Sequence, residues 1–240
     1  MIDTAWLSRT ELLIGKENLE KLHRSHVLVV GMGGVGSFAA EFICRAGVGE
    51  MTIVDGDVVD PSNRNRQLPA LATTHGQSKA DLMSERLIQI NPELKLHVIK
   101  EFIMPGMVDN LLSAPFDFVV DAIDSITPKL TLIKAAYAKN LKLVSSMGAG
   151  GKLDPTKLHV TDISKTYNCP FAQQIRKQLR QEGIKNGIKV VFSPEEPDKK
   201  SIMRTDGSNF KKSAYGTISY LPATFGATLS SVVIRDLIEM

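Results

Sequence analysis

A short apolar run followed by closely spaced glycines limits the fold of this chain more than any other feature. Residues 26–40 read HVLVVGMGGVGSFAA. The β-branched run at 26–30 is typical of a buried strand, and residues 37–46 have the apolar spacing of a helix. A strand, a glycine-rich turn and a helix in this order form a unit that binds a phosphate at the helix N-terminus. We therefore expect a nucleotide-binding unit at this point of the chain.

The glycines of this run are predicted to have separate tasks. Gly31 permits a tight turn, and Gly36 lets the helix pack closely on the strand. Gly33 and Gly34 let backbone N–H groups approach a phosphate, and the helix N-terminus adds about half a positive charge beneath the anion. The pattern alone leaves open a nicotinamide cofactor, a flavin, ATP, or tight packing without a ligand.

Helices and strands alternate through the following hundred or so residues. The sequence predicts a polar helical segment at 4–24, strands at 51–54, 95–99, 116–124 and 141–145, and helices at 77–91, 108–112 and 130–139. This alternation is typical of an α/β fold with a doubly wound, Rossmann-like parallel sheet, which binds ligands at the C-terminal edge of its strands.

We expect the 240 residues to form a single domain with three parts: a nucleotide-binding core at 8–150, a basic insertion at 151–216, and a strand and helix at 217–240 that return to the core. Residues 152–215 hold 13 Lys and Arg against 7 Asp and Glu, a net charge of +6, whereas the rest of the chain has −3. This excess indicates either an anionic macromolecular partner or a solvated face. Mobility is expected around residues 195–209, where Pro, Gly and Lys are frequent.

Composition excludes several classes of protein. The two cysteines, Cys44 and Cys169, cannot supply a four-thiolate zinc site, and such low cysteine usage fits a reducing cytoplasm. No apolar run approaches the roughly 18 residues needed to span a membrane, and the first residues do not resemble a signal peptide.

Polar residues after the predicted strands favour ATP over the other nucleotides. Asp55 stands 19 residues after Gly36, where a carboxylate can accept hydrogen bonds from ribose hydroxyls. Cations in the loop that follows can balance charge on the phosphoryl groups of a reacting triphosphate. The candidate ligand-binding residues of this region are Asp55, Asp57, Asn63, Arg66, Lys79 and Asp124.

Each of these residues also has a structural interpretation. Asp57 and Asn63 can cap turns, Arg66 can form an ion pair, and Lys79 can point to water. Lys79 begins a predicted helix, where a cation is unfavourable, so that a nearby anion would account for it.

Taken together, the stretches GMGGVG, VDGDVVDPSNRNRQ, GQSKA and DAIDS resemble the ATP-dependent adenylating superfamily. That superfamily includes the ubiquitin-activating enzymes and the activators of sulfur carriers. Within it, RTELLIGKENLEKL, SSMGAGGKLDPTKLHVTDISKT and CPFAQQIRKQLRQEGI resemble the bacterial tRNA threonylcarbamoyladenosine dehydratases. The likeness extends over nearly the whole chain.

The resemblance implies that ATP and Mg²⁺ are the cofactors. The glycine loop, Gly31–Gly36, and Asp55 would hold the adenosine part. Asn63, Arg66 and Lys79 would contact the phosphates. Asp57 belongs to the same nucleotide-binding set, and Asp124 would bind Mg²⁺ or orient the α-phosphate. The residues expected to act in catalysis are Arg9, Arg66, Lys79 and Asp124.

The implied substrate is tRNA that carries threonylcarbamoyladenosine beside the anticodon. Adenylation of the threonyl carboxylate and intramolecular ring closure would remove one water. The basic excess would serve the tRNA backbone, and Arg9 would reach the neighbouring subunit's ATP in a homodimer. The residues expected to bind tRNA are Lys165, Arg176, Lys177 and Arg180.

A second interpretation is ATP-dependent adenylation of the C-terminus of a ubiquitin-like sulfur-carrier protein. Cys169 would then be a candidate acceptor, and a sulfur-relay protein would be a further partner. Relatives with that activity often carry paired CxxC zinc ligands, which this chain lacks. Ring closure within the substrate, by contrast, needs no nucleophile from the enzyme.

Overall fold

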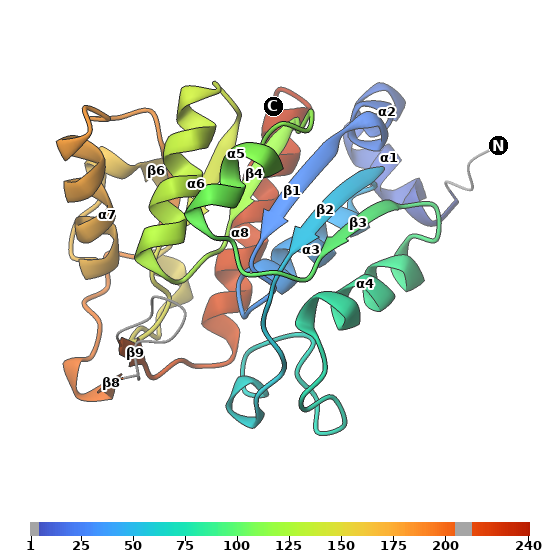
Figure 1. The fold of residues 1–240 in the computed structure, drawn as a ribbon. Helices are drawn as coiled ribbons and strands as arrows, with labels where there is room; N and C mark the ends of the chain where they lie inside the picture. Colours follow the sequence, from blue (N-terminus) through green and yellow to red (C-terminus); the bar gives the residue numbers. More distant parts are fainter. Residues whose placement is uncertain (1–4, 205–212) are drawn as a thin grey trace.

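The computed structural model describes residues 5–204 and 213–240. Within these residues seven strands form one sheet in the order β3-β2-β1-β4-β5-β7-β6, and β8 and β9 form a separate hairpin (Figure 1). The strands are β1 His26–Val30, β2 Glu50–Val54, β3 Lys95–Ile99, β4 Phe118–Asp121, β5 Leu143–Ser146, β6 His159–Asp162, β7 Lys189–Phe192, β8 Ile202–Arg204 and β9 Ser213–Tyr215.

The sheet is parallel except at one edge, where β6 pairs antiparallel with β7. Chain order runs outward from β1 through β2 to β3 on one side, and from β4 onward on the other. The direction of winding therefore reverses between β1 and β4, which is the point where open α/β sheets bind ligands.

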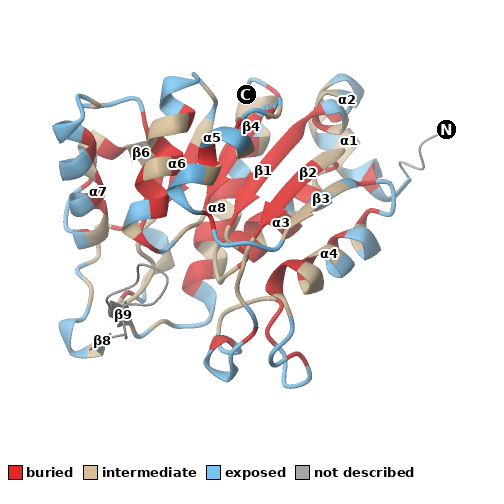
Figure 2. Cartoon of the chain, in the orientation of Figure 1, coloured by how far each residue is buried: buried red, intermediate tan, exposed pale blue. Residues whose placement is uncertain are grey.

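Helices cover both faces of the sheet (Figure 1). On one face α3, α4 and α8 pack against alternate residues of the strands, and on the other face α5 and α6 do so. In Figure 2 the inner strands β1, β2 and β4 are buried along nearly their whole length, whereas the edge strand β3 is partly exposed. The helices are α1 Ser8–Ile14, α2 Lys16–Arg24, α3 Gly36–Arg45, α4 Lys79–Ile90, α5 Val108–Leu111, α6 Ile126–Ala138, α7 Pro170–Gln181 and α8 Tyr220–Leu237.

The predicted α/β class and the alternation of elements are confirmed, but the strand expected within residues 217–240 is wrong. These residues are all described, and they hold a single long helix, α8, while β9 ends at Tyr215. Leu221, Phe225, Leu229 and Val232 follow helical spacing and are buried against the sheet and α3. Burial of this apolar stripe favours a helix more strongly than the β-branched residues at the start of 217–240 favour a strand.

The basic insertion predicted at 151–216 contributes to the main sheet, because β6 and β7 extend it beyond β5. The mobility predicted around residues 195–209 stays a prediction. Residues 205–212 lie outside the described residues, and 195–204 contain β8. No helix in the described part of the chain combines the length and apolar character that a membrane span requires.

Candidate active site

The glycine loop joins β1 to α3 at the switch point of the sheet. Gly31 has a φ of +94°, which favours glycine, and its N–H donates to Val54 O at 2.8 Å. A Cβ on Gly36 would lie 1.7 Å from Gly31 O, so the helix can approach the strand only through glycine. No side chain caps the start of α3. The start of α3 can therefore offer N–H groups that no side chain caps to an anion.

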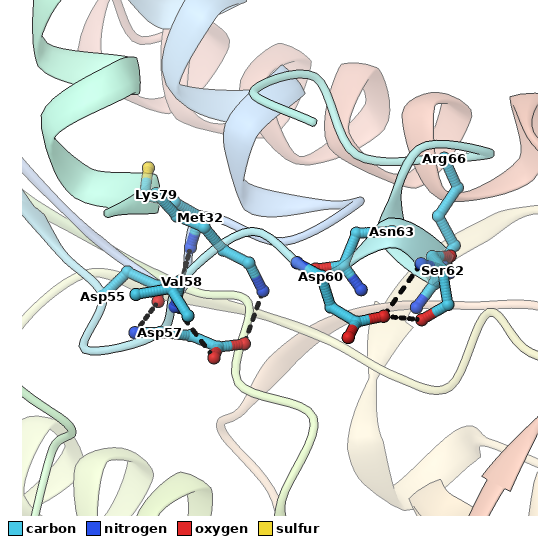
Figure 3. Close-up of polar contacts among 9 residues, drawn as sticks. All are labelled: Met32, Asp55, Asp57, Val58, Asp60, Ser62, Asn63, Arg66 and Lys79. Atoms are coloured by element: carbon cyan, nitrogen blue, oxygen red, sulfur yellow. Dashed lines mark hydrogen bonds and ion pairs between the residues drawn. The ribbon is translucent and has the colours of Figure 1, made fainter. Parts of the chain in front are cut away.

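Asp55 ties the glycine loop to the loop after β2 (Figure 3). Its Oδ2 accepts from Met32 N at 2.6 Å, and its Oδ1 accepts from Asp57 N at 2.7 Å. Burial raises the pKa of the Asp55 carboxyl, although these two N–H donors act in the opposite direction. The carboxylate expected to bind ribose thus has a structural task in addition.

Asp57 lies on the outer side of this loop and forms an ion pair with Lys79. The Nζ of Lys79 is 2.5 Å from Asp57 Oδ2, and Figure 3 shows the lysine side chain reaching from the start of α4 toward the loop. The Lys79 side chain is 5% exposed and that of Asp57 is 48% exposed. The lysine is therefore held by protein, while the carboxylate faces solvent.

Asn63 has the capping role that its residue type allows. Its Oδ1 accepts from Asp60 N at 3.2 Å, and Asp60 in turn caps the same short 3-10 turn through Ser62 N at 2.8 Å. Asn63 is 8% exposed. The turn fixes the backbone just before Arg66.

Arg66 lies against the glycine loop. A Cβ on Gly34 would be 3.1 Å from Arg66 O and 3.4 Å from its Cγ. The guanidinium donates to Ser62 O at 3.0 Å and to Asn65 Oδ1 at 2.8 Å. Burial lowers the pKa of Arg66, and the negative charge of Asp124 opposes that shift. The structure therefore brings a cation and a carboxylate together beside the loop.

Beneath Asp124 lies a fully buried ionic cluster at the end of β4. Lys129 Nζ is 2.6 Å from Asp121 Oδ2 and 3.0 Å from Ser145 Oγ, and neither side chain of the ion pair is exposed. Asp121 Oδ1 also accepts from Ile123 N at 3.1 Å. Burial lowers the pKa of Lys129, while the charges of Asp121 and Asp124 raise it. The cluster fixes the backbone immediately before Asp124.

An apolar cavity of ≈330 Å³ lies beside the ends of β2 and β3. Val54 forms part of its wall and precedes Asp55 directly. The sequence pattern did not indicate this cavity, because its wall combines the end of β2 with β3 and with α5, which begins more than fifty residues after β2. Its lining residues are Val54, Ile99, Glu101, Ile103, Gly106, Met107, Asn110 and Leu111.

Gln67 is a further site residue that the sequence prediction did not select. Its Oε1 is buried and has no hydrogen-bond partner among the described residues, and its Nε2 lies 3.8 Å from where a Cβ of Gly33 would be. A buried amide oxygen without a partner needs an explanation, and a hydrogen-bond donor on a ligand bound beside the glycine loop would supply one. The only sequence signal was its place at the end of the stretch NRNRQ.

The four residues expected to bind tRNA differ in their surroundings. Lys165, Lys177 and Arg180 are exposed. Arg176 instead donates to the backbone oxygen and hydroxyl of Thr166 and attaches α7 to the preceding turn. Arg176 therefore has a structural contact that the other three do not share.

Arg9 is exposed on α1 and is not brought to the glycine loop of its own chain. Leu7, just before α1, lies beside Gly47 at the far end of α3, since a Cβ on Gly47 would be 2.9 Å from Leu7 Cδ1. The ten residues of α3 make that end about 15 Å from the glycine loop. Figure 1 likewise shows α1 beside α2, close to where β1 begins.

The two cysteines are buried and form no disulfide. Cys169 stands at the start of α7 and is 5% exposed. Burial lowers the pKa of the neighbouring Lys152, which donates to Ser193 O at 2.6 Å, and Cys169 opposes that shift. A thiol enclosed in this way is poorly placed to accept a group from a macromolecular substrate.

Comparison with known proteins identifies the family of this site. The family model described as "ThiF family" matches residues 7–239. The tRNA threonylcarbamoyladenosine dehydratase of Bacillus subtilis (strain 168) is 43% identical, over 97% of this chain and 94% of that protein.

Two solved structures have the same fold over the full length. The Escherichia coli tRNA N6-threonylcarbamoyladenosine dehydratase, TcdA, in complex with ATP has a TM-score of 0.90 and 36% identity, covering 100% of this chain and 97% of the other. The same enzyme in complex with AMP has a TM-score of 0.89 at 36% identity, with the same coverage. The chain therefore belongs to the ThiF family, and its relatives within that family place it with the tRNA threonylcarbamoyladenosine dehydratases.

Proposed function

We propose that this protein uses ATP to dehydrate threonylcarbamoyladenosine in tRNA to its cyclic form. The observation that carries the proposal is that Arg66 lies against the glycine loop before the uncapped start of α3, with the charge of Asp124 acting on it, while Lys79 is paired with Asp57 in the loop that Asp55 ties to the glycine loop. Phosphoryl transfer needs positioning and charge balance more than it needs a protein nucleophile, and this site offers both.

The purine of ATP is proposed to enter the cavity beside Val54, where apolar walls can cover its faces. The ribose then reaches the loop after β2. Both oxygens of Asp55 already accept backbone N–H groups, whereas Asp57 is more exposed, so Asp57 is the better placed carboxylate for the ribose hydroxyls. When a phosphate attracts Lys79, Asp57 loses its present partner and gains the hydroxyls.

The phosphates are proposed to lie over the glycine loop, between Lys79 on one side and Arg66 on the other. The amide nitrogen of Asn63 and that of Gln67 are further donors, because the oxygen of Asn63 is engaged in its turn. The position of Gln67 Nε2 beside Gly33 supports this placement.

Asp124 is the carboxylate that fits Mg²⁺ in this site. Asp121 is fully buried and its oxygens are engaged by Lys129, Ser145 and Ile123, whereas Asp124 is exposed beside Arg66. A carboxylate together with phosphate oxygens is the usual ligand set of this ion, which would neutralise charge on the triphosphate.

The threonyl carboxylate attacks the α-phosphorus of ATP, and pyrophosphate leaves. Arg66 and Lys79 balance the charge that moves onto the phosphate oxygens. The carbamoyl group of the same nucleoside then attacks the activated carbonyl and expels AMP, with loss of a proton. One ATP is split and the nucleoside loses one water, without a covalent bond to the enzyme.

We propose a homodimer as the active form, with Arg9 reaching the ATP of the neighbouring subunit. Residues 5–14, which form α1 and the turn before it, expose a group of apolar side chains. Such a group is typical of a surface that another protein covers. Leu12 is 83% exposed, Leu13 84% and Trp6 41%. A second copy of the chain is the proposed occupant, since Arg9 cannot serve the glycine loop from its position in its own chain.

The proposal is tested by incubating the protein with ATP, Mg²⁺ and tRNA that carries threonylcarbamoyladenosine, followed by mass analysis of the nucleosides. We expect loss of one water from the modified adenosine, and no change in tRNA that lacks the modification. An ATP analogue with a methylene group between the α- and β-phosphates should block the reaction. One with the methylene between the β- and γ-phosphates should support it.

Unchanged nucleosides, in a preparation that binds ATP, would contradict the proposal. Release of pyrophosphate only when a ubiquitin-like carrier protein is added would favour the sulfur-carrier interpretation instead.

A further inference from the structure

Three side chains with metal-binding atoms converge at the edge of the sheet opposite the glycine loop. His26 begins β1, Glu50 begins β2 and His97 lies within β3, so the three come from adjacent strands. His26 pairs with Glu50 in the sheet register, and Glu50 pairs with Lys95. Because His97 follows Lys95 by two residues, all of these side chains lie on one face. The backbone of a sheet thus holds the group in place.

The distances within the group approach those of a metal site. The Nε2 of His97 is 2.8 Å from Glu50 Oε1, and the Nδ1 of His26 is 3.5 Å from the same oxygen. One ligand atom from each residue lies within 4.8 Å of the other two. Zinc bonds of 2.0–2.1 Å in a tetrahedron place ligand atoms about 3.3 Å apart. Small side-chain movements would therefore suffice to bind an ion.

His26 is oriented by contacts on its other side. Its Nε2 is 2.9 Å from the hydroxyl of Thr52, which is 4% exposed. A proton on Nε2 can be donated to that hydroxyl, which leaves Nδ1 as the free lone pair facing Glu50. The ring of Phe116 packs edge-on against His26 at 4.6 Å between centroids and limits its rotation. A partner on the second ring nitrogen is typical of metal-binding histidines.

The group is enclosed on one side and open on the other. Exposure of the side chains rises from 11% for His26 through 26% for Glu50 to 47% for His97. An ion can enter from the side of β3, and water can complete its coordination there. Three protein ligands with one open position are a known arrangement for zinc.

We propose that His26, Glu50 and His97 bind one divalent transition-metal ion, with zinc as the ion that suits two imidazoles and a carboxylate. Among residues 5–204 and 213–240, no other group of His, Cys, Asp or Glu side chains has this geometry. The ion would join the beginnings of β1 and β2 to β3, at the opposite ends of the strands from the nucleotide. Its role is to stabilise the sheet and not to take part in adenylation.

Lys95 now forms an ion pair with Glu50, and its replacement distinguishes a metal site from a simple ion-pair cluster. Its Nζ is 2.9 Å from Glu50 Oε1, and its side chain is 66% exposed. A bound ion would displace this ammonium group into solvent. Removing the lysine charge should therefore strengthen metal binding, whereas it would weaken a cluster that serves only as an ion pair.

The test is a calorimetric titration of untagged, chelator-treated full-length protein with zinc chloride alone. We expect one equivalent of zinc per chain, and a rise of about 5–10 °C in Tm at a free zinc concentration 100 times the Kd. His97→Gln and Glu50→Gln should each weaken binding at least about tenfold, and Lys95→Gln should strengthen it. His75→Gln, an exposed histidine outside the group, is the control and should change nothing.

His97 lies half-exposed on the edge strand β3, so His97→Gln should fold even if Glu50→Gln does not. Circular dichroism and Tm of the metal-free variants check this. Cobalt(II) gives a second measurement, since the wild type should show the visible absorption of a four-coordinate ion and His97→Gln should not. Absence of zinc binding by the wild type, or equal affinity in His97→Gln, would overturn the proposal.

Discussion

The ammonium group of Lys79 lies 2.5 Å from the carboxylate of Asp57, across 22 residues of sequence and at the entrance of the proposed phosphate site. Ser78 caps α4 immediately before Lys79, so the lysine occupies the first turn of a helix, where its charge is unfavourable. Asp57 offsets that charge in the free protein. A nucleotide phosphate would compete for the same ammonium group.

Replacement of Lys79 should reduce turnover more than ATP binding. Loss of one contact that balances transition-state charge typically lowers the rate on the order of 100-fold. We expect a rate reduction of that size in Lys79→Ala at saturating ATP, measured as nucleoside dehydrated per unit time. ATP binding is measured separately by calorimetry. Asp57→Asn is the matched control, and it should weaken ATP binding more than it slows turnover. An unchanged rate in Lys79→Ala would remove Lys79 from the mechanism.

Lys129 should prove essential to the fold around Asp124. Removing one partner of a buried ion pair leaves the other charge without compensation and typically costs about 3–5 kcal/mol. Lys129→Met should therefore lower the free energy of unfolding by about that amount in urea titrations. The double variant Lys129→Met with Asp121→Asn should recover a large part of the loss. Equal instability of the double and single variants would mean that the charge on Asp121 is not the cause.

The exposed cations of α7 should contribute to tRNA affinity. Lys177→Glu and Arg180→Glu should weaken tRNA binding and reduce the salt dependence of log K by about one unit for each phosphate that the variant no longer neutralises. ATP affinity should not change. Lys16→Glu, on the exposed face of α2, is the matched charge reversal and should leave tRNA binding intact. Arg176 is unsuitable for this test because it bonds to Thr166. Equal tRNA affinity in all three variants would show that α7 faces bulk water.

Arg9 should act across a dimer interface. Arg9→Ala and Asp124→Ala should each be nearly inactive, and their mixed dimers should regain one site that has both residues. Random exchange makes about half of the dimers mixed, so activity should recover to roughly a quarter of wild type. Native mass spectrometry confirms the exchange. No recovery in confirmed mixed dimers would mean that Arg9 acts within its own chain or not at all.

Local pattern was sufficient for most elements of the fold. The β-branched run at His26–Val30 forms β1 with the predicted bounds, and Lys95–Ile99 forms β3 likewise. The glycine loop followed from the same pattern because its spacing reflects backbone geometry that only glycine allows. The strand predicted in residues 217–240 was wrong. The apolar residues there would also suit a strand, but they serve the packing of α8 on α3.

Features that depend on long-range packing were beyond the sequence pattern. Nothing local indicates that β6 pairs antiparallel beyond β7, since register is set by which faces are buried in the finished sheet. Lys129 reads as an ordinary helix lysine, and its burial against Asp121 requires the position of β4 to be known. The likeness to the adenylating superfamily assigned Asn63 to the phosphates, but only the structure shows that its oxygen accepts a hydrogen bond within a turn.

The proposed activation of the threonyl carboxylate by adenylation can be followed through the transfer of an oxygen isotope. The measurement uses tRNA whose threonylcarbamoyladenosine carries ¹⁸O in the carboxylate, with mass analysis of the nucleotide products. Attack on the α-phosphorus joins a carboxylate oxygen to AMP, and ring closure then breaks the bond from that oxygen to carbon. We predict AMP with one ¹⁸O atom and unlabelled pyrophosphate. Label in inorganic phosphate together with ADP, or AMP without label, would contradict the account.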